Sequence, residues 1–283
     1  MPEGDTVWLT AHRLHTALAG QVLTRFDLRV PRFATVDLTG RSVQEVAARG
    51  KHLLMRFDGG LTLHSHLRMD GAWRVFAVSE RWRGGPAHQI RAVLGTAART
   101  AVGYRLPVLD VLRTRDEPQV VGHLGPDLLG PDWDAATALA NLTSDPARPL
   151  GDALLDQRNL AGIGNVYRSE LAFLARVTPW LPVGELPQGI APRLVATAHR
   201  LLEANKHTFD RRTVPGTARP LLYVYGRRGE PCLRCGTPVR KAAQREARPS
   251  TAGAEPDDGE RVTYWCPGCQ SGPQDRSFPA PTR

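Results

Sequence analysis

Two cysteine pairs constrain the fold of this chain more than any other feature of its sequence. Its only cysteines are Cys232 and Cys235, followed by Cys266 and Cys269, and each pair has CxxC spacing. A CxxC turn holds two thiolates close together, and two such turns complete a tetrahedral sulfur site suited to Zn²⁺. Because the protein would supply all four ligands, this single zinc ion would be structural and not catalytic. The alternatives are four free thiols or a redox pair, and the paired spacing disfavours both.

The segment that contains the cysteines, residues 227–270, predicts a β-hairpin whose base the metal would close. Strand-like runs occur at 238–240 and 261–265, one after the first cysteine pair and one before the second. Between them, residues 247–260 are polar and have almost no large apolar side chains, so we expect a disordered insertion. Residues 271–283 are expected to form a frayed tail.

The charge balance favours a polyanionic partner. Among 283 residues, 37 Lys and Arg outnumber 28 Asp and Glu, which gives a net charge of +9. This surplus favours nucleic acid over membrane, with coding bias toward Arg as the alternative explanation. No apolar run approaches the ~18 residues that cross a bilayer, and the acidic N-terminus is not typical of a secretion signal. We therefore expect a soluble, intracellular protein with no membrane partner.

The first 120 residues predict a β-rich domain that begins with one helix. Apolar residues recur at helical spacing between positions 7 and 18, and Gly20 ends the pattern. Short alternating runs separated by turn residues follow, among them residues 22–26, 52–57, 61–64 and 73–76. Such runs are typical of antiparallel hairpins, so residues 1–120 are predicted to form a helix with a β-sandwich or barrel.

A helical domain is predicted to follow. Gly and Pro crowd residues 122–131, which indicates a domain boundary. Within residues 131–226, Ala- and Leu-rich segments predict helices at 134–142, 149–157, 166–175 and 191–205. The predicted fold class is therefore α+β, with a helix and β-sandwich, a helical domain and a C-terminal cysteine hairpin.

A glycine-rich turn separates two of these helical segments. Gly162 and Gly164 precede Asn165, and glycine permits a turn that exposes successive backbone N–H groups at a helix N-terminus. Such a terminus binds phosphate readily. Asn165 could cap the second helix or donate to a phosphate. A plain glycine turn is the alternative interpretation.

Three residues in the first domain could carry covalent chemistry. Removal of Met1 would leave Pro2 as a secondary amine, and an α-amino group has a pKa of about 8. Such an amine attacks an aldehyde-level carbon to give a cationic iminium, and the adjacent Glu3 could move protons. Lys51 follows Gly50 and is one of three lysines in an Arg-rich chain, which favours a need for a compact ammonium. Taken singly, an ordinary N-terminus and a solvated lysine would explain these residues.

The motifs, in their order along the chain, closely resemble the formamidopyrimidine-DNA glycosylase and endonuclease VIII family of base-excision repair enzymes. They are Met1-Pro2-Glu3-Gly4, Gly50-Lys51-His52, the turn at 162–165 and the two CxxC pairs, and they span residues 1 to about 270. The N-terminal motif is more similar to the endonuclease VIII branch. The resemblance implies a β-sandwich, a helix–two-turn–helix domain and a zinc finger, with damaged DNA between the two domains. It also implies a monomer in the cytoplasm, associated with the nucleoid.

The resemblance implies a role for each matched residue. Pro2 would attack C1′ of the damaged nucleotide and Glu3 would act as general acid and base. Lys51 matches a lysine that contacts phosphate near the lesion and assists catalysis. Asn165 matches a phosphate-binding asparagine, and Arg261 matches the zinc-finger arginine that grips the backbone.

Met69 lies in residues 66–71, which match the loop that fills the gap left by a flipped base. The alternative is that Met69 is a core residue beside a tight turn. The chain departs from its relatives where it has Asp5-Thr6 in place of a second acid near position 6, in the 247–260 insertion, and in lacking an Arg-x-Phe wedge in the 110–125 region. Duplex, single-stranded and bubble substrates therefore stay open.

The leading hypothesis is a bifunctional DNA glycosylase and AP lyase that removes oxidised pyrimidines through a Schiff base and β/δ-elimination. An oxidised-purine enzyme is the second hypothesis. A non-catalytic zinc-finger DNA-binding protein is the third, and the presence of Pro2, Glu3 and Lys51 argues against it.

Overall fold

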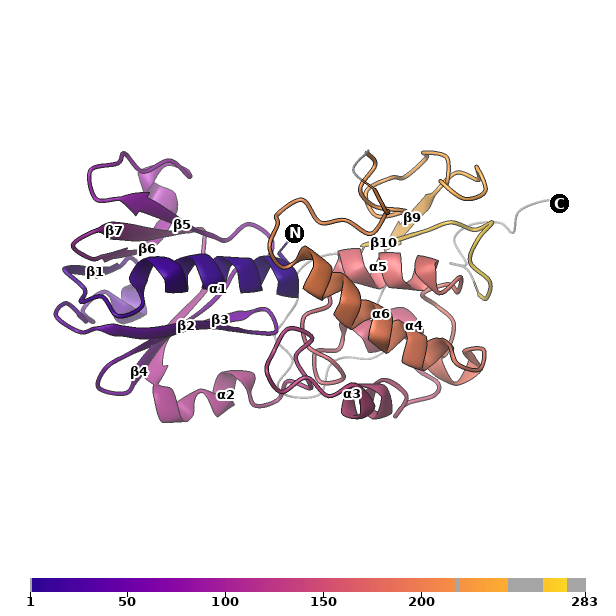
Figure 1. The fold of residues 1–283 in the computed structure, drawn as a ribbon, viewed down its shortest axis with the longest axis horizontal. Helices are drawn as coiled ribbons and strands as arrows, with labels where there is room; N and C mark the ends of the chain where they lie inside the picture. The colour runs from indigo at the N-terminus through magenta and orange to yellow at the C-terminus, as the bar shows by residue number, and fades with distance from the viewer. Residues whose placement is uncertain (1, 217–218, 244–261, 274–283) are drawn as a thin grey trace.

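A computed structural model describes residues 2–216, 219–243 and 262–273 and places a β-sandwich beside a helical domain. In Figure 1 the sandwich lies at the left, the helices at the right and a short hairpin at the upper right, with the N-terminus where the two halves meet. The predicted fold class is confirmed. The predictions for Arg261 and for residues 247–260 fall outside the described residues, as does the predicted tail from 274 to 283. The expected fraying is wrong for Ser271, whose N–H donates to Arg176 O at 3.0 Å and whose carbonyl accepts the Thr178 N–H at 2.9 Å.

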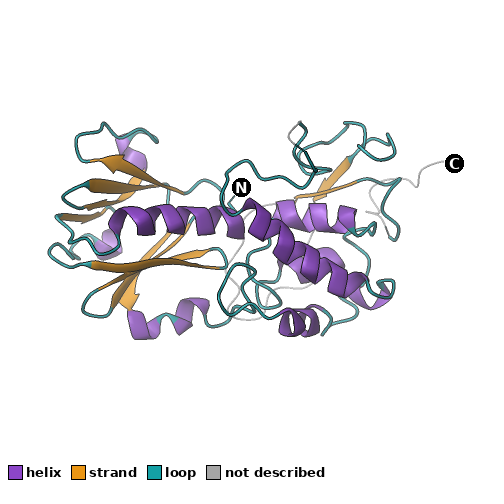
Figure 2. Ribbon diagram, in the orientation of Figure 1, coloured by secondary structure: helices purple, strands orange, loops and turns teal. Residues whose placement is uncertain are grey.

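The N-terminal domain has one helix and two four-stranded antiparallel sheets, as Figure 2 shows by secondary structure. The helix is α1 (Gly4–Leu18). One sheet has the order β1-β6-β7-β5 and the other the order β2-β3-β4-β8. The strands are β1 (Arg25–Leu28), β2 (Val43–Arg49), β3 (His52–Phe57), β4 (Leu61–His66), β5 (Ala72–Ala77), β6 (Ile90–Gly95), β7 (Arg99–Tyr104) and β8 (Val108–Arg113).

The core of this domain forms between the sheets and the apolar face of α1. Val7, Leu14 and Leu18 of the helix are at most 1% exposed and join one cluster with Phe57 and Leu94 from the two sheets. The structure is therefore a sandwich, one of the two predicted architectures. Since α1 packs against β2 and β5, its N-terminus is carried to the second domain.

The strand predicted at 22–26 was placed too early. β1 begins at Arg25, whereas Val22 forms an isolated bridge with Ser42. The backbone between them forms hydrogen bonds with residues 40 and 41 and not with a strand of the sheet. Leu23 N–H donates to Arg41 O at 2.8 Å, and Gly40 N–H donates to Leu23 O at 2.8 Å. Apolar alternation was present, but the long-range pairing that sets the strand boundary was not visible in it.

A short helix leads to the helical domain, where the predicted segments are helical with boundaries displaced by a few residues. The helices are α2 (Pro118–Val121), α3 (Ala135–Leu142), α4 (Leu150–Leu155), α5 (Asn165–Leu174) and α6 (Ile190–Asn205). Leu150, Ile163, Tyr167, Leu171 and Leu202 are 0% exposed and belong to one apolar cluster. α4 and α5, with the turns between them, form the helix–two-turn–helix.

The hairpin consists of β9 (Arg240–Ala243) and β10 (Val262–Trp265), paired antiparallel. β9 begins two residues later than the predicted run, because Pro238 forms an isolated bridge with Pro231 instead. The hairpin packs on α5, where Arg168 Nη2 donates to Val262 O at 2.9 Å. Within the described residues no helix is both long and apolar enough to cross a membrane.

Candidate active site and nucleic-acid interface

Glu3 caps helix α5 from another domain. Its carboxylate accepts three backbone N–H groups, from Gly164 at 2.9 Å, Val166 at 2.7 Å and Tyr167 at 3.2 Å. The side chain is fully buried. The first N–H groups of a helix lack partners within the helix and carry partial positive charge, so a carboxylate is favoured there. The interaction fixes the residue beside Pro2 to the helix–two-turn–helix.

Two glycines make this approach feasible. A Cβ on Gly164 would lie 2.6 Å from Glu3 Cδ, so only a residue without a side chain leaves room for the carboxylate. Gly162 has φ +116°, a conformation that L-residues rarely adopt, and its carbonyl accepts the Gly4 N–H at 2.8 Å. The N-terminal turn of α1 therefore packs directly against the glycine turn.

The N–H groups of Gly162 and Gly164, which were considered for phosphate binding, have partners within the protein. The Gly162 N–H donates to Gln157 Oε1 at 2.9 Å, and the Gly164 N–H is held by Glu3. The helix terminus does bind an anion, as the pattern indicated, but that anion is the protein's own carboxylate. Asn165 is the first residue of α5 and is half-buried, while the cap position belongs to Gly164. The capping role considered for Asn165 is thus performed by Glu3.

A second buried acid lies in the first turn of α1. Asp5 is 1% exposed and accepts a hydrogen bond from Tyr167 Oη at 2.8 Å and from Arg211 Nε at 2.6 Å. Burial and the Asp5 carboxylate raise the pKa of Tyr167 above its ordinary value, so the phenol stays neutral. Burial opposes the charge of Arg211, but the carboxylates of Glu3 and Asp5 outweigh it and raise the pKa of Arg211.

Lys51 reaches the same place from the turn between β2 and β3. The preceding Gly50 donates its N–H to Asp127 Oδ2 at 2.7 Å, and a Cβ on Gly50 would lie 3.1 Å from Ala161 Cβ. Asp127 is buried, which raises the pKa of its carboxyl group. The turn that carries Lys51 therefore packs on residue 161, next to the glycine turn that receives Glu3. The structure thus brings Glu3, the neighbour of Pro2, and Gly50, the neighbour of Lys51, to one short segment, 161–167.

Histidines that the sequence analysis did not single out lie behind Lys51. His52 and His66 face each other on β3 and β4, and His52 Nδ1 lies 2.9 Å from His64 Nε2. Burial, then the nearby His66, lowers the pKa of His52 to about 2, and burial followed by the charge of Lys51 lowers the pKa of His66 to about 3. These rings are neutral at physiological pH and line the Lys51 side of the site without adding charge.

Met69 lies at the tip of the turn between β4 and β5 and is 56% exposed. The alternative that Met69 is a core residue is therefore wrong. The turn is held locally, with the Arg68 N–H donating to His66 Nδ1 at 3.0 Å and the Gly71 N–H donating to Leu67 O at 2.8 Å. We call residues 66–71 the wedge turn.

The four cysteines lie close enough to hold one metal ion. Their sulfur atoms are all within 4.8 Å of one another, with Cys232 Sγ 3.8 Å from Cys269 Sγ and Cys235 Sγ 3.5 Å from Cys266 Sγ. Zn–S bonds of about 2.3 Å at tetrahedral angles place the sulfurs about 3.8 Å apart. The donor set and its spacing therefore fit a tetrahedral thiolate site.

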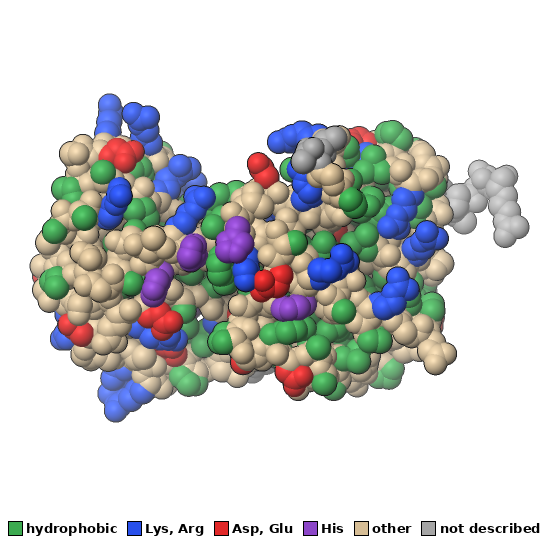
Figure 3. Space-filling view, in the orientation of Figure 1, with side chains coloured by type: hydrophobic (Ala, Val, Ile, Leu, Met, Phe, Trp, Pro, Cys, Tyr) green, Lys and Arg blue, Asp and Glu red, His purple; other side chains and the backbone are tan. Residues whose placement is uncertain are grey.

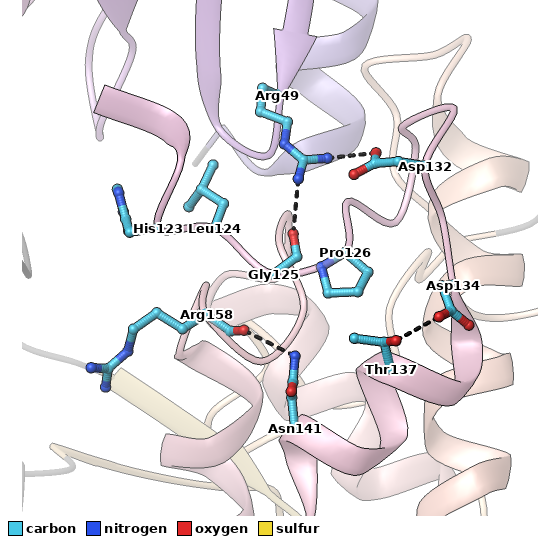
Figure 4. A pocket seen from close by; sticks show the side chains of 10 residues that line it. All are labelled: Arg49, His123, Leu124, Gly125, Pro126, Asp132, Asp134, Thr137, Asn141 and Arg158. Atoms are coloured by element: carbon cyan, nitrogen blue, oxygen red, sulfur yellow. Dashed lines mark hydrogen bonds and ion pairs between the residues drawn. The ribbon is translucent and has the colours of Figure 1, made fainter. Parts of the chain in front are cut away.

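A cavity of about 470 Å³ lies between the domains, and the predicted catalytic residues are not part of its lining. As Figure 4 shows, Arg49 Nη1 lies 2.6 Å from Asp132 Oδ1 and Arg49 Nη2 donates to Gly125 O at 3.2 Å, across the cavity lining. Pro2, Glu3 and Lys51 do not line it. The cavity thus marks the linker, and the ion pair fixes the β2 end that precedes Lys51.

Basic side chains are spread over both domains on the face that Figure 3 shows, with acidic side chains among them. Some basic side chains of the molecule are paired with acids, as in Arg29 with Asp27 at 3.1 Å and Lys206 with Glu203 at 2.7 Å. The net positive charge is therefore not gathered into one patch on this face.

A β-sandwich joined to a helix–two-turn–helix, with an N-terminal turn seated on the second helix, defines the class of DNA glycosylases that use their N-terminus. Two family models match the chain: the formamidopyrimidine-DNA glycosylase N-terminal domain over residues 1–105, and the formamidopyrimidine-DNA glycosylase H2TH domain over residues 124–208. The chain belongs to the formamidopyrimidine-DNA glycosylase and endonuclease VIII family.

Several named relatives are similar over nearly the whole chain. "Probable endonuclease 8 2" of Streptomyces coelicolor is 66% identical, covering 98% of this chain and 96% of that protein. "DNA-(apurinic or apyrimidinic site) lyase Nei2" of Mycolicibacterium smegmatis is 48% identical, covering 96% of this chain and 99% of that protein. "Endonuclease 8" of Escherichia coli is 32% identical over 95% of this chain. The predicted class of enzyme, a base-excision DNA glycosylase with AP lyase activity, is confirmed by these relatives.

Solved structures show the same fold. A complex of the Lactococcus lactis Fpg with DNA containing an abasic site has a TM-score of 0.76 at 23% identity and covers 95% of this chain and all of that one. A structure of MutM with DNA containing carbocyclic 8-oxo-G also has a TM-score of 0.76 at 23% identity. At this identity the likeness concerns the fold, and both neighbours are DNA complexes.

Proposed function

We propose that this protein removes oxidised pyrimidines from damaged DNA and cuts the strand at the resulting abasic site, with Pro2 as the nucleophile. The observation that carries the proposal is how the N-terminal turn is fixed. Glu3, next to Pro2, is fully buried, and its carboxylate accepts three N–H groups at the N-terminus of α5. An ordinary chain start has no need of such a fixed carboxylate. The endonuclease 8 names of the relatives agree with the endonuclease VIII branch of the family, on which the choice of pyrimidines rests.

The proposed chemistry begins at the Pro2 nitrogen. Its lone pair forms a bond to C1′ while the glycosidic bond breaks, and the departing base takes the bonding pair and a proton. The Pro2 nitrogen then loses its proton and its lone pair expels O4′ from C1′, so that the sugar ring opens and O4′ takes a proton. The resulting iminium acidifies the C2′ proton. Loss of that proton breaks the C3′–O bond, and a second elimination breaks the C5′–O bond. The iminium is the electron sink for both cuts.

Glu3 is proposed to move the protons. Its Oε2 accepts two N–H groups, whereas among the described residues Oε1 accepts one, from Val166. A carboxylate oxygen has room for two donors, so Oε1 keeps an acceptor position for a reacting proton. Positioned acid–base groups of this kind contribute about 10²–10⁴-fold to the rate.

The remaining residues are proposed to hold the DNA. Lys51, on the turn beside residue 161, would pair with the phosphate next to the lesion, and the side chain of Asn165 and the Arg261 guanidinium would bind further phosphates. Met69 would occupy the space that the flipped nucleotide leaves. We propose residues 1–120 as the catalytic domain, 131–226 as the helical DNA-binding domain and 227–270 as the zinc finger.

The four cysteines are proposed to hold one structural Zn²⁺. Bound zinc would supply a rigid closure for the base of the hairpin, and with four thiolate ligands it would have no open position for substrate. The cluster lies against Phe173 of α5 through Cys232 and Cys266. The hairpin is thereby attached to the helix whose N-terminus holds Glu3.

Borohydride trapping tests the proposal. Incubation with DNA that contains an abasic site or an oxidised pyrimidine, followed by reduction, should give a covalent complex on the N-terminal peptide, and absence of the complex would refute the lyase mechanism. The intact mass of the protein should show that Met1 has been removed, because an acylated Pro2 nitrogen is not nucleophilic.

Two rival functions have their own outcomes. Preference for oxidised purines in a lesion panel would move the protein to the second hypothesis, and binding without trapping on any substrate would make it a non-catalytic DNA-binding protein. The proposal further expects a monomer that works on the chromosome in the cytoplasm, and sedimentation of the free protein and of its DNA complex tests the monomer.

A further inference from the structure

We propose that Arg211 is a positioning residue for the reaction: by pairing with Asp5 it cancels a buried negative charge that would otherwise keep the Pro2 amine protonated. The inference rests on the proposed role of Pro2. Arg211 lies after α6, in the connection that leads to the hairpin, and no motif in the sequence pointed to it. It reaches across the domain boundary into the first turn of α1.

The contacts of Arg211 are specific and sheltered. Its side chain is 10% exposed, Nε donates to Asp5 Oδ2 at 2.6 Å and Nη2 donates to Thr6 Oγ1 at 3.1 Å. The Nη2 atom also pairs with Asp5 Oδ1. The guanidinium lies over the ring of Tyr167, 4.9 Å from its centroid. This is a two-pronged Arg–carboxylate pair, which a lysine ammonium cannot reproduce.

The same guanidinium also faces the catalytic acid. Arg211 Nη1 lies 3.9 Å from Glu3 Oε1, the oxygen with the remaining acceptor position. Two phenols also interact with these carboxylates, Tyr167 with both and Tyr225 with Glu3. Tyr167 and Tyr225 both have their pKa raised, mainly by burial, so neither supplies charge. Two buried carboxylates therefore share one cation.

The consequence for Pro2 is electrostatic. An unpaired carboxylate in a buried site favours protonation of a neighbouring amine, and a protonated amine cannot attack C1′. Asp5 is three positions from Pro2 in the chain and is paired with Arg211, and the carboxylate adjacent to Pro2 in sequence, that of Glu3, is stabilised by the N-terminus of α5. The pair also accounts for the departure at positions 5 and 6, because Asp5 and Thr6 are the two residues that the Arg211 fork contacts.

The pH dependence of trapping distinguishes this role from a purely structural one. Single-turnover borohydride trapping on abasic DNA is measured from pH 5 to pH 10 for the wild type, Arg211→Gln, Asp5→Asn, the double variant and Arg211→Lys. In a plot of trapping rate against pH, the rising limb is the range in which the rate increases with pH. Arg211→Gln should move this limb about one pH unit upward, with about tenfold slower trapping at pH 7 and recovery at high pH. Asp5→Asn leaves the guanidinium uncompensated and should move the limb downward.

The double variant removes both charges and should return the limb to the wild-type position, and Arg211→Lys should lie between the wild type and Arg211→Gln. Arg29→Gln, which removes a surface arginine paired with Asp27, is the matched control. Equal losses at every pH in Arg211→Gln and Asp5→Asn, with no movement of the limb, would overturn the inference. If Arg211→Gln does not fold, the downward shift in Asp5→Asn decides the question. No trapping by the wild type would instead refute the proposed function.

Discussion

The N-terminal turn and the wedge turn face the same proposed substrate but are built in different ways. Glu3 and Asp5 are fully buried and bonded to residues of the helical domain more than 160 positions away in sequence. Met69 is 56% exposed, and its turn is held within the N-terminal domain, by hydrogen bonds between residues two and four positions apart and by Arg105 Nε, which donates to Asp70 O at 3.0 Å. The N-terminal turn is fixed only where the two domains meet, while the wedge turn lies within one domain, in the connection from β4 to β5 that joins its two sheets.

The difference between the two turns shows which side chains must be positioned precisely. Covalent attack on one carbon requires the nucleophile and its acid–base partner within a fraction of an ångström, and only a buried network that spans both domains fixes them so closely. A side chain that fills a gap in stacked bases needs shape and reach more than exact placement. Changes at the N-terminal turn should therefore affect catalysis and stability together, and changes at the wedge turn should affect DNA binding alone.

Gly164→Ala should have the largest effect. Gly164 has φ −124°, which alanine tolerates, so the damage comes from the Cβ that would lie 2.6 Å from Glu3 Cδ. Displacing Glu3 leaves buried N–H groups unpaired, and we expect a loss of about 1–3 kcal/mol in the free energy of unfolding for each such group and at least a hundredfold loss of trapping rate. Gly40→Ala, which introduces backbone strain at φ +87° with no atom within 4 Å, controls for stability loss alone. A wild-type trapping rate in Gly164→Ala would contradict the proposal that catalysis needs Glu3 bound to the N-terminus of α5.

Glu3→Gln tests the same turn with little change of shape. The amide keeps one acceptor oxygen but presents a donor to N–H groups that need an acceptor, so one or more of the three bonds is lost. We expect base release to slow about 10²–10⁴-fold in single-turnover assays, with a smaller stability loss than in Gly164→Ala. Glu203→Gln, an exposed acid paired with Lys206, should match the wild type. Unchanged base release would remove Glu3 from the mechanism.

Cys232→Ser should affect the N-terminal turn more than the wedge turn. Loss of one thiolate should release the metal, and bound zinc measured by mass spectrometry should fall below one per chain. The hairpin packs on α5 through Arg168 and Ser169, so its loosening reaches the helix that holds Glu3. We expect at least tenfold weaker DNA binding and slower trapping at saturating DNA. One zinc retained per chain would show that the four-thiolate site is wrong.

Much of the fold was predictable because its signals are local. The helices at 134–142 and 191–205 and the strands at 52–57 and 61–64 follow from periodicity, and the structure places all four within a few residues. CxxC spacing likewise determined the sulfur cluster, because a short turn leaves the two thiols few other arrangements. Boundaries set by long-range pairing, as at Val22, were placed incorrectly.

The candidate site was predictable only in part. Pro2, Glu3 and Lys51 were found from an ordered set of motifs, but the partners of Glu3 were not, because they are backbone N–H groups that any sequence supplies. Arg211 carried no signal, since it is one of many arginines and its partner lies 206 positions away. A glycine turn at a helix N-terminus predicted an anion, but the sequence did not reveal that Glu3 binds there, because burial decides whether the terminus meets solvent or another domain.

Acid should destabilise the region around the wedge turn through two buried histidines. His66 and His52 have pKa values of about 3 and about 2 in the folded protein and near 6.5 when unfolded. Unfolding therefore takes up protons below pH 6.5, and the free energy of unfolding should fall as the pH drops from 6.5 toward 3, by up to about 1.4 kcal/mol per unit for each ring. Urea denaturation at pH 7 and pH 5 should show a shallower dependence in His66→Gln and a wild-type dependence in His88→Gln, an exposed histidine. Equal slopes in all three proteins would contradict the lowered pKa of His66.

Met69→Ala should have the smallest effect on the protein itself. At 56% exposure the side chain buries little apolar area, so the free energy of unfolding should change by less than about 0.5 kcal/mol. Its contribution arises only when a nucleotide leaves the stack, and we expect about tenfold weaker binding to a duplex with an abasic site, with binding to a single strand unchanged. Val78→Ala, at 57% exposure beyond the end of β5, is the matched control and should bind both substrates as the wild type does. Equal weakening on duplex and single strand would show that Met69 contacts DNA generally, whereas undiminished binding to both would place the wedge elsewhere and leave the two turns without a shared substrate.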